Sequence, residues 1–388
     1  MRILICHNEY AAPSGEEHAI RALGELLHCR GHVVDFFLRS STGIRSTQDK
    51  VNAFFSGIHS PNAVASLRNV LAVQRPDVAF VQNLYPFLSP SILPLLRRAG
   101  IPVVMRCPNY RLFCPNGLFL SHEELCERCC GGHEYWAILR NCESAWLKSI
   151  GYAARNATAR LTGRIVDNVD YFIVLSQFQR HKFIANGLSE ARVKILPNIS
   201  PPLPCIAEGS ASKDLGTRVT FVGRVSPEKG IEDFIAAARM LPNIPFVVVG
   251  NYDRMSSLLR QSPTNVTWTG FLAGAALDDA YRSSRILVIP SRCFEGFPNV
   301  ITRAMMFDRP VIAARIGAIP EIVAEDVTGL LYSPQCVDEL VTKIRLLYQD
   351  IDRCSQMGLA GHAKAERCYS REVVGRQLDA LLTQVLNL

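Results

Sequence analysis

The sequence predicts an α/β protein built from two doubly wound, parallel-sheet domains. The chain has 388 residues, more than a single core usually organises. Short apolar, β-rich runs alternate with helical patterns in both halves, which is typical of parallel sheets joined by helices. A proline-rich break at residues 197–204 separates the halves, and the pattern restarts after it.

The first domain is expected over residues 1–200. Its buried strands are predicted at residues 3–6, 33–38, 77–81, 101–105 and 170–175, which are continuous apolar runs of the kind found in sheets covered on both faces. After the first strand comes a helix whose apolar positions recur at helical spacing and which ends near Gly31.

The second domain is expected over residues 205–370. The small and polar stretch at 207–216, near its start, is read as part of the linker between the domains. Its strands are predicted at residues 219–222, 246–249, 266–268, 286–289 and 311–313, and its main helices at 231–241, 299–307 and 337–348. The last segment, residues 371–388, is predicted to be a helix that crosses back to the first domain.

Composition limits the classes of function. Hydrophobic residues make up 48% and charged residues 20%, so both domains can bury ordinary cores and no long disordered region is expected. The net charge of +7 fits either a slightly basic solvated surface or a basic face for a phosphate-bearing partner or an anionic membrane. The basic residues that gather in the sequence are Arg155, Arg160, Arg164, Arg180, His181 and Lys182. There is no basic stripe with interleaved aromatic residues, so nucleic acid is not an expected partner.

The expected location is the cytoplasm. The first apolar run ends at Cys6, too soon for a signal-peptide core, and no run of about 18 apolar residues could cross a bilayer. Peripheral contact with the inner face of a membrane remains open. A reducing cytosol would keep the 13 cysteines as thiols unless a metal holds them.

Ligands of open parallel sheets bind at the carboxyl ends of the strands, and two such domains facing each other would enclose one cleft. One candidate loop, residues 221–230, carries Arg224 and Lys229 just before a predicted helix start at Gly230. Two cations beside a helix N-terminus form a clamp for a diphosphate. The alternative is two solvated charges in a surface loop.

A second loop, residues 289–300, also joins a strand to a helix. Pro298 suits the first helical position, and the N–H groups of the first turn would then point at a ligand. Glu295 is an acceptor-only carboxylate suited to sugar hydroxyls, or else a helix-dipole partner. A third loop holds Gly15, where the backbone could approach a phosphate or an acceptor closely. It is not a G-x-G-x-x-G motif, so no dinucleotide cofactor is indicated.

These loops together resemble the family 4 glycosyltransferases, which are retaining enzymes of the GT-B fold. The resemblance spans nearly the whole chain and is strongest at residues 222–224, 228–230, 290–291, 295–297, 309–313, 317–323 and 328–331. It implies transfer of a sugar from a nucleotide-diphosphate sugar to a glycan, lipid-linked or small-molecule acceptor, with no metal required for transfer.

The resemblance also implies roles for individual residues. Arg224 and Lys229 would neutralise the departing diphosphate, because fixed cations stabilise that charge best in a closed, dry site. Glu295 would hold hydroxyls of the donor sugar. The implied donor-binding set is Gly15, Gly223, Arg224, Lys229, Glu295, Gly296, Phe297, Pro298, Asn299 and Arg303.

Two positions depart from the family pattern. Arg303 stands where the family usually carries a second Glu, and an arginine cannot accept hydrogen bonds from ribose hydroxyls. On the acceptor side, many relatives have a histidine at the site that here reads Arg106-Cys107-Pro108, so Arg106, Asn109 and Tyr110 become the acceptor-side candidates. An inactive relative that binds a nucleotide sugar or glycan, and a GT-B epimerase or phosphorylase, therefore remain alternatives.

The segment 107–142 is rich in cysteine and is expected to lie on the acceptor side. Cys126 and Cys129 form a C-x-x-C pair, which Cys114 and Cys142 flank at similar distances. Four such thiolates could hold a structural zinc ion or an iron–sulfur cluster. Free thiols and disulfides are the alternatives, and a module whose main function is metal binding is a further reading.

Overall fold

The computed structural model describes residues 1–11, 15–201 and 215–387. Most of the predicted linker, residues 207–216, lies outside the described residues. The chain divides into two compact units. The first unit comprises Met1–His122, Cys126–Ile199 and Val374–Leu388, and the second comprises Glu123–Leu125 and Ser200–Val373.

The first unit is built on a parallel sheet of six described strands in the order β2-β1-β3-β4-β7-β8. The strands are β1 (Arg2–Glu9), β2 (Val33–Ser40), β3 (Val78–Val81), β4 (Val103–Arg106), β7 (Tyr171–Val174) and β8 (Val193–Ile195). A separate short pair is formed by β5 (Leu120–Ser121) and β6 (Glu124–Leu125). All side chains of β3 and β4 are buried, as expected for central strands covered on both faces.

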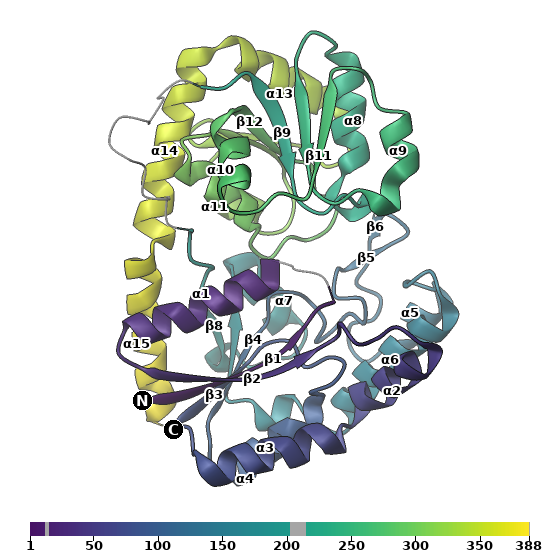
Figure 1. Ribbon diagram of the computed structural model, residues 1–388, viewed down its shortest axis with the longest axis vertical. Coiled ribbons are helices and arrows are strands. Elements are labelled where there is room, and N and C mark those ends of the chain that lie inside the picture. Colours follow the sequence, from purple (N-terminus) through teal and green to yellow (C-terminus); the bar gives the residue numbers. More distant parts are fainter. Residues whose placement is uncertain (12–14, 202–214, 388) are drawn as a thin grey trace. The chain divides into compact units, whose positions relative to one another are not determined.

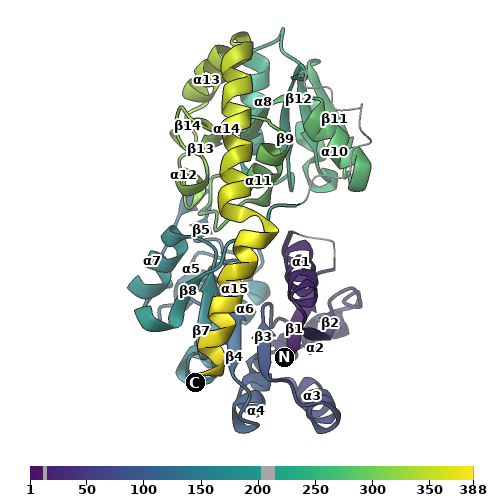
Figure 2. The same ribbon diagram turned by 90° about the vertical axis from the view of Figure 1, so that its left-hand side faces the viewer.

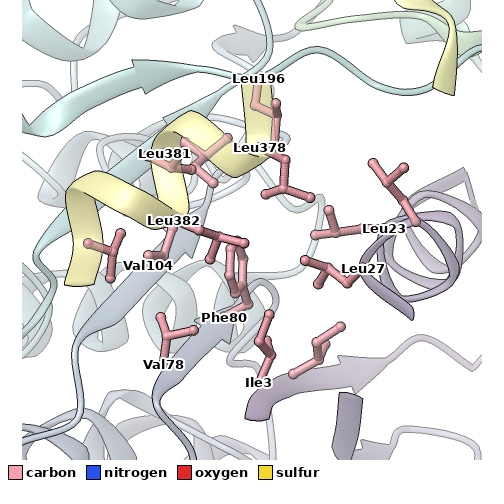
Figure 3. Close-up of a cluster of buried hydrophobic side chains, with 14 of the residues drawn as sticks. Ile3, Leu23, Leu27, Val78, Phe80, Val104, Leu196, Leu378, Leu381 and Leu382 are labelled. Atoms are coloured by element: carbon pink, nitrogen blue, oxygen red, sulfur yellow. The ribbon is translucent and has the colours of Figure 1, made fainter. Parts of the chain in front are cut away.

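The helices of this unit are α1 (Gly15–Cys29), α2 (Thr47–Ile58), α3 (Pro61–Val73), α4 (Leu93–Arg98), α5 (Tyr135–Leu139), α6 (Trp146–Leu161), α7 (Gln177–Ala185) and α15 (Arg371–Leu386). Figure 1 shows α3 and α4 on the opposite side of the sheet from α1. Helix α15, in yellow in Figure 2, packs on the same core as α1. Figure 3 shows Leu378 and Leu382 of α15 meeting Leu27 of α1 and Phe80 of β3. This cluster forms a hydrophobic core between the sheet, α1 and α15.

The second unit also has a parallel sheet of six described strands, in the order β11-β10-β9-β12-β13-β14. Its strands are β9 (Arg218–Val222), β10 (Phe246–Val249), β11 (Val266–Gly270), β12 (Ser284–Ile289), β13 (Val311–Ala314) and β14 (Gly329–Tyr332). In chain order this arrangement is 3-2-1-4-5-6, the order of dinucleotide-binding domains. The direction of winding reverses between β9 and β12.

The helices of the second unit are α8 (Ile231–Met240), α9 (Ser256–Arg260), α10 (Gly274–Arg282), α11 (Asn299–Met306), α12 (Ile319–Ile322), α13 (Val337–Gln349) and α14 (Ile351–Tyr369). Phe234 of α8 packs edge-on against Phe246 of β10, with ring centroids 5.2 Å apart. Helix α14 packs on α11, where Met305 contacts the bare backbone of Gly361. The helix that opens the candidate loop is therefore anchored in the core.

The α/β fold class predicted from the sequence is confirmed. Every predicted strand is present, but the edge strands β8 and β14, three and four residues long, were not predicted. Helix α15 begins at Arg371, and its residues from Val374 onward belong to the first unit. Within the described ranges, no helix is both long and apolar enough to cross a membrane.

Candidate active site

The candidate donor loops leave the second sheet where its winding reverses. The chain leaves β9 toward β10 on one side and leaves β12 toward β13 on the other, and in parallel sheets ligands bind at the carboxyl ends of the strands beside such a reversal. The two loops are tied together here, because the backbone N–H of Arg292 donates to the carbonyl of Glu228 over 3.0 Å. The Arg292 guanidinium also donates to Asp233 of α8 over 2.6 Å. This fixes one loop against the other.

A glycine allows the close approach of the loops. Gly230 has φ = 69°, in the left-handed region that favours glycine. A Cβ at this position would lie 1.8 Å from the carbonyl oxygen of Pro290 in the other loop. Helix α8 begins at the next residue. Residue 230 must therefore be glycine for the two loops to meet at this distance.

Lys229, Ser291 and Glu295 meet at one carboxylate oxygen. The Nζ atom of Lys229 donates to Oε1 of Glu295 over 2.5 Å, and Oγ of Ser291 donates to the same oxygen over 2.6 Å. Among the described residues, no hydrogen bond reaches Oε2 of Glu295. One oxygen thus holds the carboxylate in place and the other remains available to a ligand.

Charge keeps this carboxylate ionised. Burial alone would raise the pKa of Glu295, but the ammonium of Lys229 and the hydrogen bonds from Lys229 and Ser291 hold its pKa below the ordinary value. Burial would likewise lower the pKa of Lys229, and the Glu295 carboxylate raises it instead. Both partners are charged at neutral pH. Arg224, earlier in the same loop as Lys229, has 66% of its side chain exposed and forms an ion pair with Glu228 at 3.2 Å.

The backbone around Glu295 is supported from behind. Gly317 approaches so closely that a Cβ there would lie 2.6 Å from the backbone N and O of Glu295. The N–H of Ala318 donates to the carbonyl of Glu295 over 2.9 Å. The ring of Phe297 packs edge-on against Tyr369, with centroids 5.0 Å apart. Phe297 therefore anchors the loop through its side chain and can face a ligand only through its backbone.

Helix α11 begins at the predicted residue, but Pro298 does not take the first helical position expected for it. The helix begins at Asn299, so Pro298 precedes its first residue and does not occupy it. Pro298 is extended, with φ = −73° and ψ = 105°. The prediction was wrong by one position, within the range over which helix ends vary. Gly296 is buried beside Glu295, and Gly223 follows β9 with a positive φ of 152°.

Arg303 lies apart from this group. Its guanidinium donates to Oδ1 of Asp278 over 2.5 Å and lies 5.6 Å from the ring centroid of Tyr281, both on α10. Tyr281 in turn stacks on Phe307. Among the described residues, Nε of Arg303 is buried without a hydrogen-bond partner. The side chain of Arg303 thus links α11 to α10, and its Nε–H group is the donor that this contact does not use.

In the first unit, the sequence candidates lie at the carboxyl end of the sheet. Gly15 is the first residue of α1 and is exposed. Arg106, at the end of β4, is buried and donates to Gln82 over 2.6 Å and to Asn198. Burial lowers the pKa of Arg106, to about 10. Tyr110 is 1% exposed, and its ring packs against Phe119 with centroids 4.7 Å apart.

A network that sequence reasoning did not find surrounds Asn109. Its amide donates to Oε1 of Glu16 over 2.9 Å, and the hydroxyl of Tyr10 donates to Oε2 of the same carboxylate over 3.0 Å. Arg111 donates to the Tyr10 hydroxyl over 2.6 Å and to Asn83 over 3.3 Å. These residues follow β1, β3 and β4. The only signal in the sequence was that each follows a predicted strand.

The four cysteines predicted as metal ligands lie near one another. Burial raises the pKa of Cys129, and negative charge on Cys114, Cys142 or Cys126 would raise it further. The thiol of Cys114 donates to Asn116 over 3.0 Å, and that of Cys142 donates to Ser121 over 3.4 Å. All described cysteines are free. In the described part of the chain, no three His, Cys, Asp or Glu side chains are arranged to hold a metal ion, so the metal site stays a prediction.

The comparisons with known proteins identify the family. The family profile described as glycosyl transferases group 1 matches residues 216–350, and the profile described as glycosyl transferase 4-like domain matches residues 14–199. Between them they span most of both units.

Among the relatives, the sulfoquinovosyl transferase of Arabidopsis thaliana is 34% identical over 168 residues, 42% of this chain and 32% of that protein. A GDP-mannose-dependent phosphatidylinositol monomannoside mannosyltransferase of Mycobacterium tuberculosis is 26% identical over 235 residues, 55% of this chain and 61% of that protein. The chain thus matches less than two thirds of the length of these relatives.

Solved structures agree over almost the entire chain. A sucrose-phosphate synthase from Thermosynechococcus elongatus superposes with a TM-score of 0.74 at 19% identity, covering 100% of this chain and 99% of that one. An Anabaena protein in complex with UDP-glucose gives a TM-score of 0.68 at 18% identity, covering 99% and 100%. At such identity the likeness shows the fold alone. With the two profile matches, it shows that the chain belongs to the family 4 glycosyltransferases and has the GT-B fold.

Proposed function

We propose that this chain is a retaining glycosyltransferase that moves a sugar from a nucleotide-diphosphate sugar to a glycan, lipid-linked or small-molecule acceptor. The observation that carries the proposal is the buried cluster of Lys229, Ser291 and Glu295 at the winding reversal of the second sheet. It combines a cation for a phosphate with a carboxylate that has one free oxygen. A donor that is both anionic and rich in hydroxyls fits this pair of groups.

The diphosphate would bind between Arg224 and Lys229. As the glycosidic bond breaks, negative charge builds on the departing phosphate, and fixed cations in a site shielded from water stabilise that charge. Lys229 is paired with Glu295 when no donor is bound, over 2.5 Å. Donor binding therefore gives Lys229 a second anion to neutralise, and the half-buried ammonium is already in place.

Glu295 would hold the sugar through Oε2. Its low pKa keeps the carboxylate ionised and able to accept hydrogen bonds at neutral pH. Ser291 and Lys229 fix Oε1, so the orientation of the carboxylate is set before the sugar arrives. This is preorganisation, in which the protein has bound the group in advance of the reaction. The transfer itself is proposed to need no metal.

The first unit is proposed as the acceptor side. The Glu16–Tyr10–Arg111 network and Arg106 place hydrogen-bonding groups at the carboxyl end of its sheet. A polar acceptor would suit these groups. Gly15 is proposed to approach the donor phosphate, and Gly296, Phe297, Pro298 and Asn299 to contact the donor through backbone atoms.

The direct test is product analysis by NMR. UDP-glucose and GDP-mannose are the first donors to try, because one neighbouring structure contains UDP-glucose and one relative is named for GDP-mannose. The expected result is donor consumption that depends on an added acceptor, with the anomeric configuration of the donor kept in the product. Glu295→Gln should strongly slow consumption, whereas Glu325→Gln, at an ion pair elsewhere in the same unit, should not.

The alternatives give different outcomes in this assay. An epimerised donor in the absence of acceptor would identify an epimerase, and consumption that requires inorganic phosphate would identify a phosphorylase. An inverted anomer would contradict the retaining mechanism. Binding of the nucleotide sugar without turnover under any of these conditions would identify an inactive relative and overturn the proposal.

A further inference from the structure

Three helices of the first unit expose large apolar side chains together. Leu147 of α6 is 83% exposed, Phe55 of α2 is 63% exposed and Leu139 of α5 is 62% exposed. The set, termed here the apolar patch, comprises Val51, Phe54, Phe55, Tyr135, Leu139, Trp146, Leu147 and Ile150. Single exposed apolar residues are ordinary, but a group of this size on neighbouring helices marks a surface that binds something.

The apolar patch is continuous. Helices α2 and α5 both pack against α6, and all three lie together in Figure 1. The ring of Phe54 covers the backbone of α6, since a Cβ on Gly151 would be 2.7 Å from it. Phe54 meets Phe55 edge-on, with centroids 5.1 Å apart.

The first turns of helix α6 distribute their side chains in the opposite way to an ordinary surface helix. Its buried positions near the start hold small residues, Ser149, Gly151 and Ala153, while the large Trp146 and Leu147 face outward. A helix that served only the core of this unit would place its large apolar residues inward. The outward face of α6 is therefore shaped for contact with another apolar phase.

Positive charge accompanies the apolar residues. Lys50 precedes Val51 on α2, Lys148 follows Leu147 on α6, and Arg45 lies just before α2; all three are exposed. The nearby acids are engaged, since Asp49 caps α2 and Glu143 pairs with Lys148 at 2.5 Å. The first unit as a whole has 23 Lys and Arg residues against 14 Asp and Glu, a net charge of +9.

The basic residues that gather at positions 155–182 of the sequence are not the ones that supply positive charge beside the apolar patch. Arg155 is buried and stacks over the rings of Tyr85 and Tyr152. Three further members form ion pairs within the unit: Arg160 with Glu134, Arg180 with Glu190 and Lys182 with Glu127. Arg45, Lys50 and Lys148 are exposed cations close in sequence to the apolar patch, and Lys148 pairs with Glu143.

We propose that the apolar patch docks this chain on the surface of an anionic lipid bilayer. Trp, Phe, Leu and Ile are the side chains that enter the boundary between headgroups and acyl chains, and adjacent Lys and Arg are attracted to anionic lipids. A second copy of the chain is a poor occupant, because pairing the same patch on two copies would bring two units of charge +9 together. The inference does not depend on the proposed enzymatic activity.

The test is co-sedimentation of the full chain with vesicles. Vesicles of phosphatidylglycerol mixed with phosphatidylcholine should bind the chain more tightly than phosphatidylcholine alone, and high salt should weaken that binding. The double variant Phe55→Ser, Leu147→Ser should lower vesicle affinity about tenfold or more, since two large side chains no longer enter the membrane. Both positions are exposed, so the fold should persist, as circular dichroism would check.

A matched control distinguishes the patch from general surface hydrophobicity. Phe271 and Leu359 of the second unit are 61% and 59% exposed, close to the values of the two test positions. The variant Phe271→Ser, Leu359→Ser should bind vesicles as the unaltered chain does. Equal loss in both double variants, or no vesicle binding by the unaltered chain, would overturn the proposal. So would self-association that the patch variant removes, because a second copy would then occupy the surface.

Trp146 supplies a direct readout of depth. Its fluorescence should shift to shorter wavelength when vesicles are added, and quenchers placed in the lipid should reduce it. The shift should disappear in Trp146→Phe, while vesicle binding remains, because phenylalanine preserves most of the apolar surface. A shift that persists in the double variant Trp136→Phe, Trp146→Phe would assign the signal to Trp268 of the second unit and contradict insertion at the apolar patch.

Discussion

The two units share an architecture but differ in how they use charge. Both have six parallel described strands with polar side chains at the carboxyl edge. The first unit carries a net charge of +9, whereas the second has 19 Lys and Arg residues against 21 Asp and Glu, a net charge of −2. Yet the second unit holds the cluster best suited to bind an anion, formed by Lys229 and its neighbours.

The difference teaches that net charge does not locate an anion site in this protein. In the second unit, two loops at a winding reversal bring a partly buried lysine and a buried carboxylate together. In the first unit, the excess positive charge is spread over the surface, and the strand-end network is neutralised internally by Glu16. Preorganised local geometry and long-range attraction are separate properties, and each can be changed without the other.

The largest effect is expected for Glu295→Gln in the second unit. The amide keeps the shape but not the charge, so turnover should fall by about a hundredfold to a thousandfold, as for loss of one preorganised polar group. The pairing with Lys229 is lost as well, which should leave nucleotide diphosphate binding intact or tighter. Steady-state kinetics and calorimetric titration measure the two quantities. Unchanged turnover would remove Glu295 from the site.

A smaller loss is expected for Ser291→Ala. The hydroxyl donates to Oε1 of Glu295 over 2.6 Å, and its removal should lower kcat about tenfold, in line with about 1 to 1.5 kcal/mol for one hydrogen bond. Ser291→Thr should restore most of the rate. Ser284→Ala is the matched control, because Ser284 of β12 donates to Thr220 of the neighbouring strand β9 over 2.6 Å and does not contact Glu295 in that bond. An equal loss in the control would mean that only packing is affected.

The variant Ser291→Ala should also change the pH dependence of turnover. The pKa of Glu295 in the folded protein lies below the ordinary value of 4.5, so its ionised form stabilises the fold above that value. That contribution is lost as the pH falls through the folded-state pKa. Because Ser291 helps to lower this pKa, Ser291→Ala should move the acid limb of the pH–rate profile to higher pH. A profile that does not move would contradict the role of the hydroxyl in holding the charge.

In the first unit, Glu16→Gln should change acceptor use without changing donor binding. The carboxylate receives hydrogen bonds from Tyr10 and Asn109, so its neutral form should weaken the network and raise the acceptor KM severalfold. The control is Glu25→Gln, at an exposed position of the same helix. A loss of nucleotide binding in Glu16→Gln would contradict the division of roles between the units.

The smallest effect on turnover is expected for Arg303→Ala. Asp278, which the variant leaves without its ion pair, is largely buried, so the free energy of unfolding should fall by about 1 to 3 kcal/mol. Adding Asp278→Asn should recover part of it. Thermal unfolding measures the stability, and kinetics with saturating donor measures the turnover. A large rise in donor KM instead would place Arg303 in contact with the nucleotide.

The cysteine segment offers a separate test of the first unit. If the predicted metal site forms, the purified chain should contain close to one equivalent of metal, and Cys126→Ser, Cys129→Ser should lack it and melt at a lower temperature. Metal analysis and thiol titration decide between a metal site and free thiols. A metal-free chain with accessible thiols would refute the metal prediction.

Much of the fold could be predicted from the sequence because central strands are continuous apolar runs. The strand predicted at residues 246–249 has the same ends as β10 in the structure. The edge strand β8 has only three residues, too few to show a pattern. The contact between Lys229 and Glu295 spans 66 positions and follows only from the order of strands in the sheet. Burial was harder to predict. Tyr110, an acceptor-side candidate, and Arg155, one of the basic residues that gather in the sequence, are both buried, and they lie in irregular or amphipathic segments whose buried face the sequence does not reveal.

The central claim is that Lys229 forms part of a nucleotide-diphosphate site in the second unit. The most direct measurement is thermal stability against a panel of nucleotide diphosphates and nucleotide sugars, since a ligand that binds only the folded state raises its melting temperature. The matched control is Lys343→Ala, because the Lys343 side chain has the same 24% exposure as that of Lys229 and also pairs with a glutamate. One nucleotide class should raise the melting temperature of the unaltered chain and of Lys343→Ala but not of Lys229→Ala. A shift that survives in Lys229→Ala, or no shift with any nucleotide, would contradict the account.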